Sequence, residues 1–257
     1  MTAEKDILNA EILQSKLNNN IEVIYYPSID STNSEAKRLL SEGKNNLLLV
    51  VSDEQTNGRG RQGKSFYSPA KTGIYMSFVF HPMADFSGVV SSTTAASVAV
   101  CRAIERLTDK RPEIKWVNDV YLNGKKICGI LCEAINDPET GRIASVIIGI
   151  GLNITTDSFP DYVENAACLG ENITRADMIS EITKELIKIL SCDYGDFIDY
   201  YRAHSTIIGK DIDFIQNGKA TRAKALEIDN VGGLIVQLDG GEIKTLKSGE
   251  ISIRWRN

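Results

Sequence analysis

Hydrophobic residues along this chain follow two different periods, which together predict a mixture of strands and helices. Short apolar runs of strand length cover residues 21–26, 47–51, 74–80 and 144–154. A longer stretch rich in Ala and Val, residues 91–107, predicts a buried helix, and residues 175–203 predict a largely helical segment. Because strands and helices do not alternate regularly, the pattern favours an α+β layer over a doubly wound parallel sheet.

Turn and cap residues refine the ends of these elements. Asn123 and Gly124 separate residues 113–122 from residues 125–135, which predicts a β-hairpin with a type I′ turn. Thr32 and Glu35 have the spacing of a capping box, so a helix is predicted to begin within residues 30–35. An amphipathic stretch, residues 3–17, precedes the first strand.

The pattern changes after residue 204. Short runs with period-two alternation are separated by turn residues at 217–218, 230–233 and 239–241. Five short strands in about fifty residues predict a small β-barrel. We therefore expect two domains, residues 1–205 and residues 206–257.

Composition narrows the function classes. The 257 residues carry 29 cations against 34 anions, and a net charge of -5 argues against a nucleic-acid surface as the main feature. The N-terminus lacks the basic-then-apolar order of a signal peptide, and the apolar runs are too short to span a bilayer. Five cysteines without a C-x-x-C pair, and only two histidines, argue against a zinc site and fit a reducing cytoplasm.

Residues 56–65 concentrate glycine and positive charge in one loop. Its three glycines and three cations are Gly58, Arg59, Gly60, Arg61, Gly63 and Lys64. Glycine leaves backbone N–H groups accessible to an anion, while Arg and Lys supply fixed positive charge. This composition therefore predicts a site for phosphate or carboxylate.

The loop matches two phosphate-binding patterns, G-x-G-x-x-G and G-x-x-x-x-G-K-[ST], which belong to different folds. Both require a loop that joins a buried strand directly to a helix. Here a polar linker, residues 52–57, precedes the loop, and Pro69 and Gly73 stand where the helix should run. We therefore interpret the loop as a mobile anion-binding segment between two strands, which orders when its ligand binds. A P-loop NTPase that depends on Lys64 remains an alternative.

Four segments, taken in order, resemble the biotin protein ligases, and a fifth resembles the end of the small barrel in the bacterial members. They are Asp30-Ser31-Thr32-Asn33; Gln55 with Gly58-Arg59-Gly60-Arg61-Gln62-Gly63; Lys115-Trp116-Val117-Asn118-Asp119 with Lys126-Ile127-Cys128-Gly129-Ile130-Leu131; Gly149-Ile150-Gly151-Leu152-Asn153; and Gly249-Glu250-Ile251-Ser252. The first twenty residues are too short for the winged helix of the relatives that act as repressors, so a short form without a DNA-binding role is expected.

The resemblance implies a fold and a reaction. Residues 1–205 would form a class II synthetase-like mixed β-sheet with flanking helices, and residues 206–257 an SH3-like barrel. Biotin and Mg-ATP would give biotinyl-5′-AMP and pyrophosphate, and a lysine of a biotin carboxyl carrier domain would then attack the mixed anhydride. The enzyme would be cytoplasmic, and its exposed sheet edges would allow a homodimer.

The resemblance also implies roles for particular residues. The catalytic cations would be Lys126 and Arg61, because two anions that react with each other need positive charge between them. The biotin-binding residues would be Ser31, Thr32, Asn33, Gln55, Arg59, Gly60, Arg61, Lys126, Gly129, Leu131 and Gly149. The ATP-binding residues would be Arg61, Phe66, Lys115, Asn118, Asp119, Lys126 and Asn153. Asp119 would also hold Mg2+, and Gly129 would let the biotin ring lie against the backbone.

Each residue taken alone has an ordinary structural explanation, such as a helix cap for Ser31 or a hairpin position for Lys126. The sequence also departs from many members of the family, with Gln62 in place of Arg, Phe66 in place of Trp and Val117 in place of Pro. A lipoate or octanoate ligase of the same superfamily remains the nearest alternative. A non-enzymatic module that senses biotin or binds the carrier is a further one.

Overall fold

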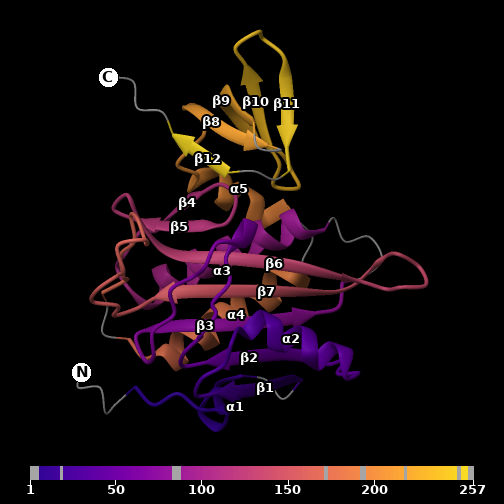
Figure 1. Ribbon diagram of the computed structural model, residues 1–257, viewed down its shortest axis with the longest axis vertical. Helices are drawn as coiled ribbons and strands as arrows, with labels where there is room; N and C mark the ends of the chain where they lie inside the picture. The colour runs from indigo at the N-terminus through magenta and orange to yellow at the C-terminus, as the bar shows by residue number, and fades with distance from the viewer. Residues whose placement is uncertain are drawn as a thin grey trace.

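Two β-sheets organise the part of the chain that the structure describes, one of seven strands and one of five (Figure 1). The computed structural model describes residues 6–17, 20–82, 88–170, 173–191, 195–216, 219–247 and 250–253. Within these ranges, no helix combines the length and the apolar character needed to cross a membrane. The α+β class predicted from the hydrophobic pattern is confirmed.

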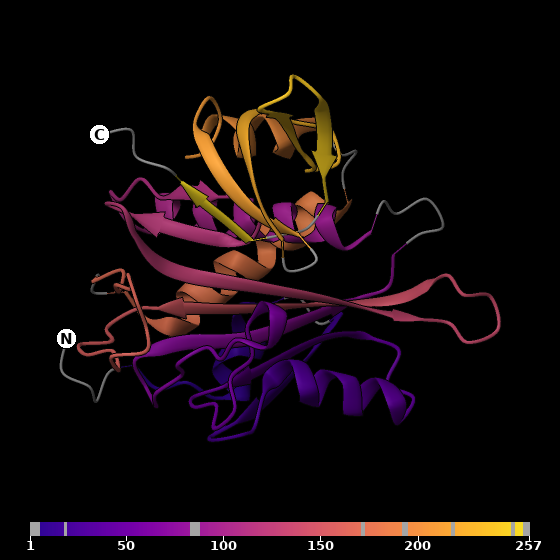
Figure 2. The same cartoon turned by 45° about the horizontal axis from the view of Figure 1, so that its top comes forward.

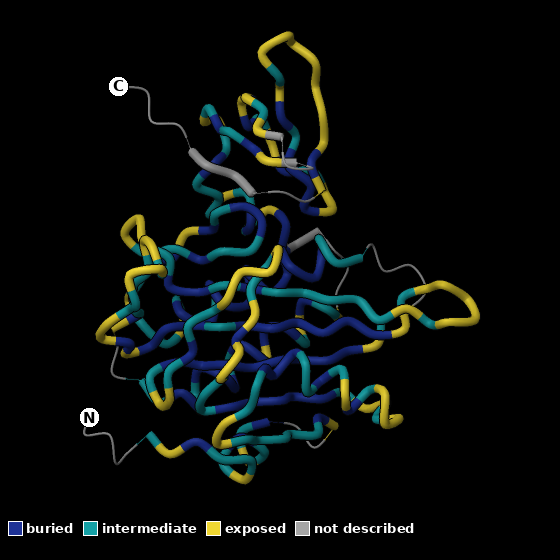
Figure 3. Tube along the Cα trace, viewed as in Figure 1, coloured by how far each residue is buried: buried dark blue, intermediate teal, exposed yellow. Residues whose placement is uncertain are grey.

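The large sheet is mixed, with strand order β1-β2-β3-β7-β6-β5-β4. Its strands are β1 (Ile21–Tyr26), β2 (Leu47–Ser52), β3 (Gly73–Phe80), β4 (Glu113–Lys115), β5 (Asp119–Leu122), β6 (Lys125–Asn136) and β7 (Ile143–Asn153). β1 and β2 are parallel, whereas every other neighbouring pair is antiparallel. β6 and β7 form the longest hairpin, whose exposed tip projects beyond the sheet (Figures 2 and 3).

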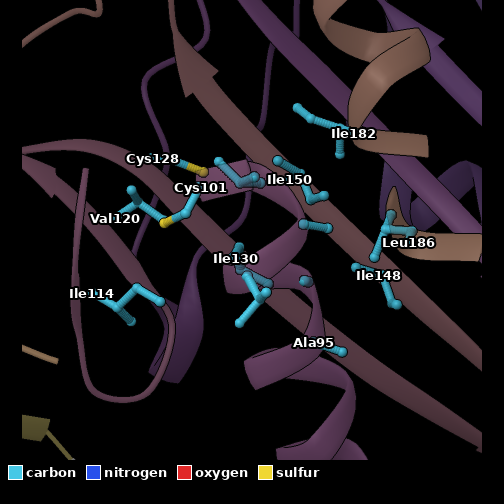
Figure 4. Packing of buried hydrophobic residues seen from close by; sticks show 14 of the residues in the cluster. Ala95, Cys101, Ile114, Val120, Cys128, Ile130, Ile148, Ile150, Ile182 and Leu186 are labelled. Carbon is cyan, nitrogen blue, oxygen red and sulfur yellow. The ribbon is translucent and has the colours of Figure 1, made fainter. Parts of the chain in front are cut away.

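Helices cover both faces of this sheet. They are α1 (Ala10–Lys16), α2 (Thr32–Ser41), α3 (Val89–Leu107), α4 (Arg175–Ser191) and α5 (Gly195–Ala203). Because side chains alternate between the faces of a strand, Ile148 and Ile150 of β7 point to the same face, where they pack near α3 and α4 (Figure 4). On the opposite face, α2 packs through Ala36 and Leu39 against residues of β2, β3 and β7, including Ile147. The part of this second face that α2 leaves uncovered is where the site lies.

The small sheet is antiparallel, with strand order β11-β10-β9-β8-β12. Its strands are β8 (Asp211–Gln216), β9 (Lys219–Ile228), β10 (Leu234–Leu238), β11 (Ile243–Leu246) and β12 (Glu250–Ile253). The five short strands predicted after residue 204 are therefore present. The predicted turn at residues 217–218 and Gly249 of the fifth family segment lie outside the described residues.

Two local predictions are wrong. The capping box does not form: Ser31 is the N-cap residue, its side chain makes no capping hydrogen bond, and the Glu35 carboxylate instead accepts from Tyr26 and Arg38. Residues 113–122 are not one strand, since β4 and β5 pair with each other across a turn that contains Trp116. Apolar residues in that turn are buried, so their hydrophobicity reflects the core and not a strand.

Most of the remaining element predictions are confirmed. The β5–β6 hairpin turns at Asn123 and Gly124, whose φ angles of 51° and 74° are both positive, as a type I′ turn requires. The buried helix predicted at residues 91–107 is α3, and the predicted helical segment at 175–203 contains α4 and α5. Of the amphipathic stretch at 3–17, residues 10–16 are helical, and residues 1–5 lie outside the described part.

Candidate functional site

A cleft of about 910 Å³ lies on the sheet face that α2 leaves partly open. Its floor follows from the strand register: Gly151 of β7 is opposite Gly129 of β6, and Gly149 is opposite Leu131. The three glycines leave the sheet without side chains at these points. A concave site is therefore built into the sheet by the sequence of β6 and β7.

The cleft brings together all of the predicted site residues, although they come from six separate stretches of chain. Its lining includes Ser31, Thr32, Asn33, Gln55, Arg59, Gly60, Arg61, Phe66, Lys115, Asn118, Asp119, Lys126, Gly129, Leu131, Gly149 and Asn153. Their individual roles toward ligands stay predictions. Their convergence into one cavity is a property of the fold.

The cationic loop is a small hairpin, residues 58–66, which we call the cationic hairpin. Phe66 N donates to Gly58 O at 2.9 Å and Gly60 N donates to Lys64 O at 2.7 Å. The tip contains a short 3-10 turn, and the positive φ angles of Gln62 (55°) and Gly63 (77°) reverse the chain there. Residues 64–72 contain no helix before β3 begins, so the structural context of a Walker or Rossmann phosphate loop is missing.

One end of the cleft gathers cations and their partners. Lys126 Nζ lies 2.7 Å from Asp119 Oδ1, and Arg61 Nη1 donates to Asn118 Oδ1 at 2.9 Å. Lys115 Nζ lies 5.7 Å from the centre of the Tyr121 ring. Burial lowers the pKa of Arg61 and the pKa of Lys115 from their ordinary values, and the Asp119 charge opposes both shifts. Partly desolvated cations of this kind attract a bound anion more strongly than cations in open solvent do.

The other end of the cleft is lined by neutral hydrogen-bonding groups. Thr32 donates through its backbone N (2.9 Å) and its hydroxyl (3.2 Å) to Gln55 Oε1. Gln55 Nε2 donates to Ser68 Oγ at 2.9 Å, and Ser68 Oγ donates to Phe66 O at 3.0 Å. Ser77 Oγ lies 2.8 Å from Thr32 Oγ1. The network fixes amide and hydroxyl groups that suit a neutral polar ligand.

Asn33 is part of the wall of the cleft. Its Nδ2 donates to Leu131 O (3.1 Å) and to Glu133 Oε2 (3.0 Å), and its Oδ1 lies 2.6 Å from Ser77 Oγ. A side chain at Gly149 would collide with Asn33, because an added Cβ would lie 2.2 Å from Asn33 Oδ1. Both polar atoms of Asn33 are thus used within the protein.

Phe66 lies over the glycines of the floor. A Cβ added at Gly151 would lie 2.5 Å from the Phe66 ring, and one added at Gly129 would lie 3.2 Å from it and 3.3 Å from Lys126 Nζ. The space that the sequence analysis assigned to a biotin ring at Gly129 is therefore bordered by Phe66 and Lys126 in this structure. The role predicted for Gly129 stays a prediction.

Asn153 carries a polar atom without a partner. Its Nδ2 donates to Ala167 O at 3.0 Å, whereas its buried Oδ1 has no hydrogen-bond partner among the described residues. A buried acceptor without a partner is costly, so a donor from outside the chain, either a water molecule or a ligand, would satisfy it. Close by, Lys126 N donates to Asn165 O at 2.9 Å, which attaches the loop around residue 165 to the start of β6.

Sequence reasoning missed several residues of the site. Ser68, Ser77 and Glu133 position predicted residues, and Tyr121 and Tyr162 line the cleft. The strand period offered one signal, because Glu133 follows Gly129 and Leu131 at two-residue steps and shares their face. Ser68 and Tyr162 lie in loops, where no periodic pattern points to the site.

Comparisons with known proteins agree with this geometry. Residues 25–153 match the model of the "Biotin/lipoate A/B protein ligase family", and residues 207–254 match the "Biotin protein ligase C terminal domain". The chain is 32% identical over 246 residues to "Bifunctional ligase/repressor BirA" of Bacillus subtilis, covering 90% of this chain and 74% of the relative. It is 26% identical over 237 residues to "Biotin--[acetyl-CoA-carboxylase] ligase" of Mycobacterium tuberculosis, covering 86% and 85%.

A solved structure is also similar. "Biotin protein ligase from Aquifex aeolicus in complex with biotin and ATP" superposes with a TM-score of 0.74 at 26% identity, covering 90% of this chain and 98% of that chain. The similarity extends over both sheets, since the coverage of each chain is nearly complete.

Proposed function

The chain belongs to the biotin/lipoate A/B protein ligase family, and from this premise we propose that it is an ATP-dependent biotin protein ligase. The observation that carries the proposal is a single cleft with a cationic end around Lys126 and Arg61 and a neutral polar end around Thr32 and Gln55. A ligand with a carboxylate at one end and a polar neutral ring at the other fits this arrangement.

The proposed reaction has two steps. A carboxylate oxygen of biotin attacks the α-phosphorus of ATP, which forms biotinyl-5′-AMP and releases pyrophosphate. The amine of a carrier lysine then attacks the acyl carbon, which forms an amide and releases AMP. Lys126 and Arg61 offset the repulsion between the carboxylate and the phosphate and stabilise the negative charge that develops on the α-phosphate.

The neutral end of the cleft favours biotin over an aliphatic acid. The ureido group of biotin offers two N–H donors and one carbonyl acceptor to the hydroxyl and amide groups of Ser31, Thr32 and Gln55. Lipoate and octanoate carry no such groups at the end that would lie there, so they would gain none of these hydrogen bonds. Sites built to hydrogen-bond a substrate reject analogues that lack the matching group.

The nucleotide is proposed to occupy the side of the cleft formed by Phe66, Lys115, Asn118 and Asn153. The buried Asn153 Oδ1 would accept a hydrogen bond from a nucleotide donor such as the adenine amino group. Phe66 would cover the base or the intermediate, and Lys115 would face the phosphates.

The residues fit a magnesium ion that arrives with ATP. Mg2+ is usually held by one or two carboxylates together with phosphate oxygens, and Asp119 supplies such a carboxylate within the cleft. The described residues contain no group of three or more His, Cys, Asp or Glu that could hold a metal without the nucleotide. When bound, the ion would neutralise charge on the phosphates.

Further features complete the proposal. The acceptor is a lysine on a biotin carboxyl carrier protein or domain, and the enzyme acts in the cytoplasm. Residues 1–205 would be the catalytic domain, and residues 206–257 would be a C-terminal SH3-like domain. β1 is an edge strand of the large sheet, so a homodimer could pair there. DNA is not among the proposed partners, because the net charge is -5.

Isotope exchange between ATP and pyrophosphate tests the proposal. We expect exchange with biotin and none without an added acid, and much weaker exchange with lipoate or octanoate. Exchange that prefers octanoate would shift the assignment to the lipoate branch of the family. ATP hydrolysis that needs no organic acid would contradict a ligase and restore the NTPase alternative.

A further inference from the structure

Arg59 of the cationic hairpin forms a two-pronged ion pair with Glu133 of β6. Its Nη2 donates to Glu133 Oε1 at 2.9 Å and its Nη1 donates to Glu133 Oε2 at 3.2 Å. The Glu133 side chain is 17% exposed and that of Arg59 is 38% exposed. Two parallel charge-assisted hydrogen bonds define both a distance and an orientation, so this pair fixes the hairpin near its base.

Other contacts of the hairpin lie where ligands must bind. Arg61 donates to Asn118 within the cleft, and the Phe66 ring lies over Gly129 and Gly151 on the cleft floor. A carboxylate and a nucleotide in the cleft would compete with both contacts. Glu133 is not part of the cleft lining, so the Arg59–Glu133 pair can persist while the hairpin tip rearranges.

Glu133 is itself held from a second direction by α2. Lys37 Nζ lies 2.7 Å from its Oε1, and Asn33 Nδ2 donates to its Oε2 at 3.0 Å. Burial opposes the charged form of Glu133, but hydrogen bonds from Lys37 and Asn33 outweigh burial and keep its pKa below the ordinary value. The carboxylate is therefore ionised at neutral pH and joins β6, α2 and the hairpin.

We propose that Glu133 is a positioning residue for adenylate formation and retention: through Arg59 it holds the base of the cationic hairpin while the hairpin tip moves on and off the ligands. Arg59 then acts mainly through its guanidinium contact with Glu133, and Asn33 through the orientation of that carboxylate. The role in retention rests on the proposed ligase function, whereas the anchoring of the hairpin does not.

Limited trypsin digestion of the ligand-free protein tests the anchoring alone. Glu133→Gln keeps the shape of the side chain but removes its charge, so we expect cleavage after Arg61 to become about tenfold faster. Lys37→Met is the matched control. Lys37 pairs with the same carboxylate as Arg59, and both side chains are 38% exposed, but Lys37 belongs to α2 and not to the hairpin. Its cleavage rate should stay near that of the wild type.

A pair of variants distinguishes an effect through Arg59 from a general loss of structure. Arg59→Met should speed cleavage after Arg61 as much as Glu133→Gln does, and the double variant should match the single ones. The proposed anchor would be wrong if Lys37→Met sped cleavage as much as Glu133→Gln does. It would also be wrong if the effects of Arg59→Met and Glu133→Gln on the cleavage rate added in the double variant. Equal melting temperatures for Glu133→Gln and Lys37→Met would exclude unfolding as the cause.

Retention of biotinyl-AMP extends the test to function. With adenylate formed from biotin and ATP, the intermediate should dissociate about tenfold faster from Glu133→Gln than from the wild type or Lys37→Met. Unchanged dissociation would overturn the positioning role. A wild-type protein that formed no adenylate would instead contradict the ligase function, and the trypsin result would still decide whether Glu133 anchors the hairpin.

Discussion

Lys126 is the residue on which the proposed chemistry depends most. Its ammonium group pairs with Asp119 at 2.7 Å and lines the cleft beside Gly129. A cation that contacts both reacting anions gains strength as charge builds on the α-phosphate, so it affects rate more than ground-state binding. Lys126→Ala should lower the adenylation rate about a hundredfold or more, which corresponds to roughly 3 kcal/mol, as measured by pyrophosphate exchange.

The stability of this variant should change little. Lys126 and Asp119 are 31% and 21% exposed, and ion pairs that reach solvent contribute little to folding. Lys64→Ala serves as the comparison, because Lys64 lines the same cleft. This substitution should lower the adenylation rate much less than Lys126→Ala does. The opposite order, a severe Lys64→Ala and a mild Lys126→Ala, would contradict the ligase assignment.

Arg61 is expected to hold the intermediate. Its guanidinium is partly buried and contacts Asn118 at the cationic end of the cleft. Arg61→Gly removes this charge and adds backbone freedom, so biotinyl-AMP should leave faster than transfer consumes it. The escaped anhydride would then biotinylate lysines of added albumin on a blot. Labelling confined to the carrier protein would argue against this role.

At the scale of elements, the cationic hairpin is the part of the site whose order should depend on ligands. Few apolar side chains anchor it, since Gly58 to Ser65 are mostly glycines and polar residues. Biotin and ATP together should protect Arg59 and Arg61 from trypsin by closing the hairpin over the intermediate. Equal cleavage with and without both ligands would show that the hairpin does not close.

The hairpin also shows how far element prediction reaches. Its glycine and arginine content predicted an anion-binding loop between two strands, and β2 and β3 do flank it. The split of residues 113–122 into β4 and β5 was not predicted, because buried residues in a turn and in a strand have the same hydrophobicity. The capping box failed for a different reason: the Thr32 hydroxyl donates a hydrogen bond to Gln55, which belongs to another segment of the chain.

At the scale of the whole molecule, the small sheet contacts the catalytic core next to the site. Trp116 Nε1 donates to Gly232 O at 2.8 Å, and Trp116 lies between Lys115 and Asn118 of the cleft. A Cβ added at Gly232 would lie 2.6 Å from Thr94 Cγ2 of α3. Gly232 is therefore a point where the part of the chain that forms the small sheet approaches the large sheet and α3 closely.

A matched pair of glycine substitutions tests this contact. Gly232 and Gly241 have similar positive φ angles, 89° and 85°, but an added Cβ meets no atom within 4 Å at Gly241. Both Gly→Ala changes strain the backbone, whereas only Gly232→Ala also collides with α3. Gly232→Ala should lower the free energy of unfolding by roughly 1–3 kcal/mol more than Gly241→Ala in urea denaturation. Equal losses would contradict a tight junction.

The sequence by itself determined most of the helices and strands of this protein and the candidate residues of its site. Hydrophobic periods and turn residues are local properties, so they identified the main strands and helices and the β5–β6 hairpin. The motif residues likewise predicted which side chains line the cleft, because their type and order are visible in the chain.

Only the tertiary structure decided which groups act on which. The register of β6 and β7 sets Gly129 opposite Gly151 and opens the cleft floor. The fold also directs Arg59 to Glu133, 74 residues away in the chain, and Gly232 to Trp116, 116 residues away. Such pairings depend on the packing of distant segments, and a single sequence carries no local pattern that specifies them.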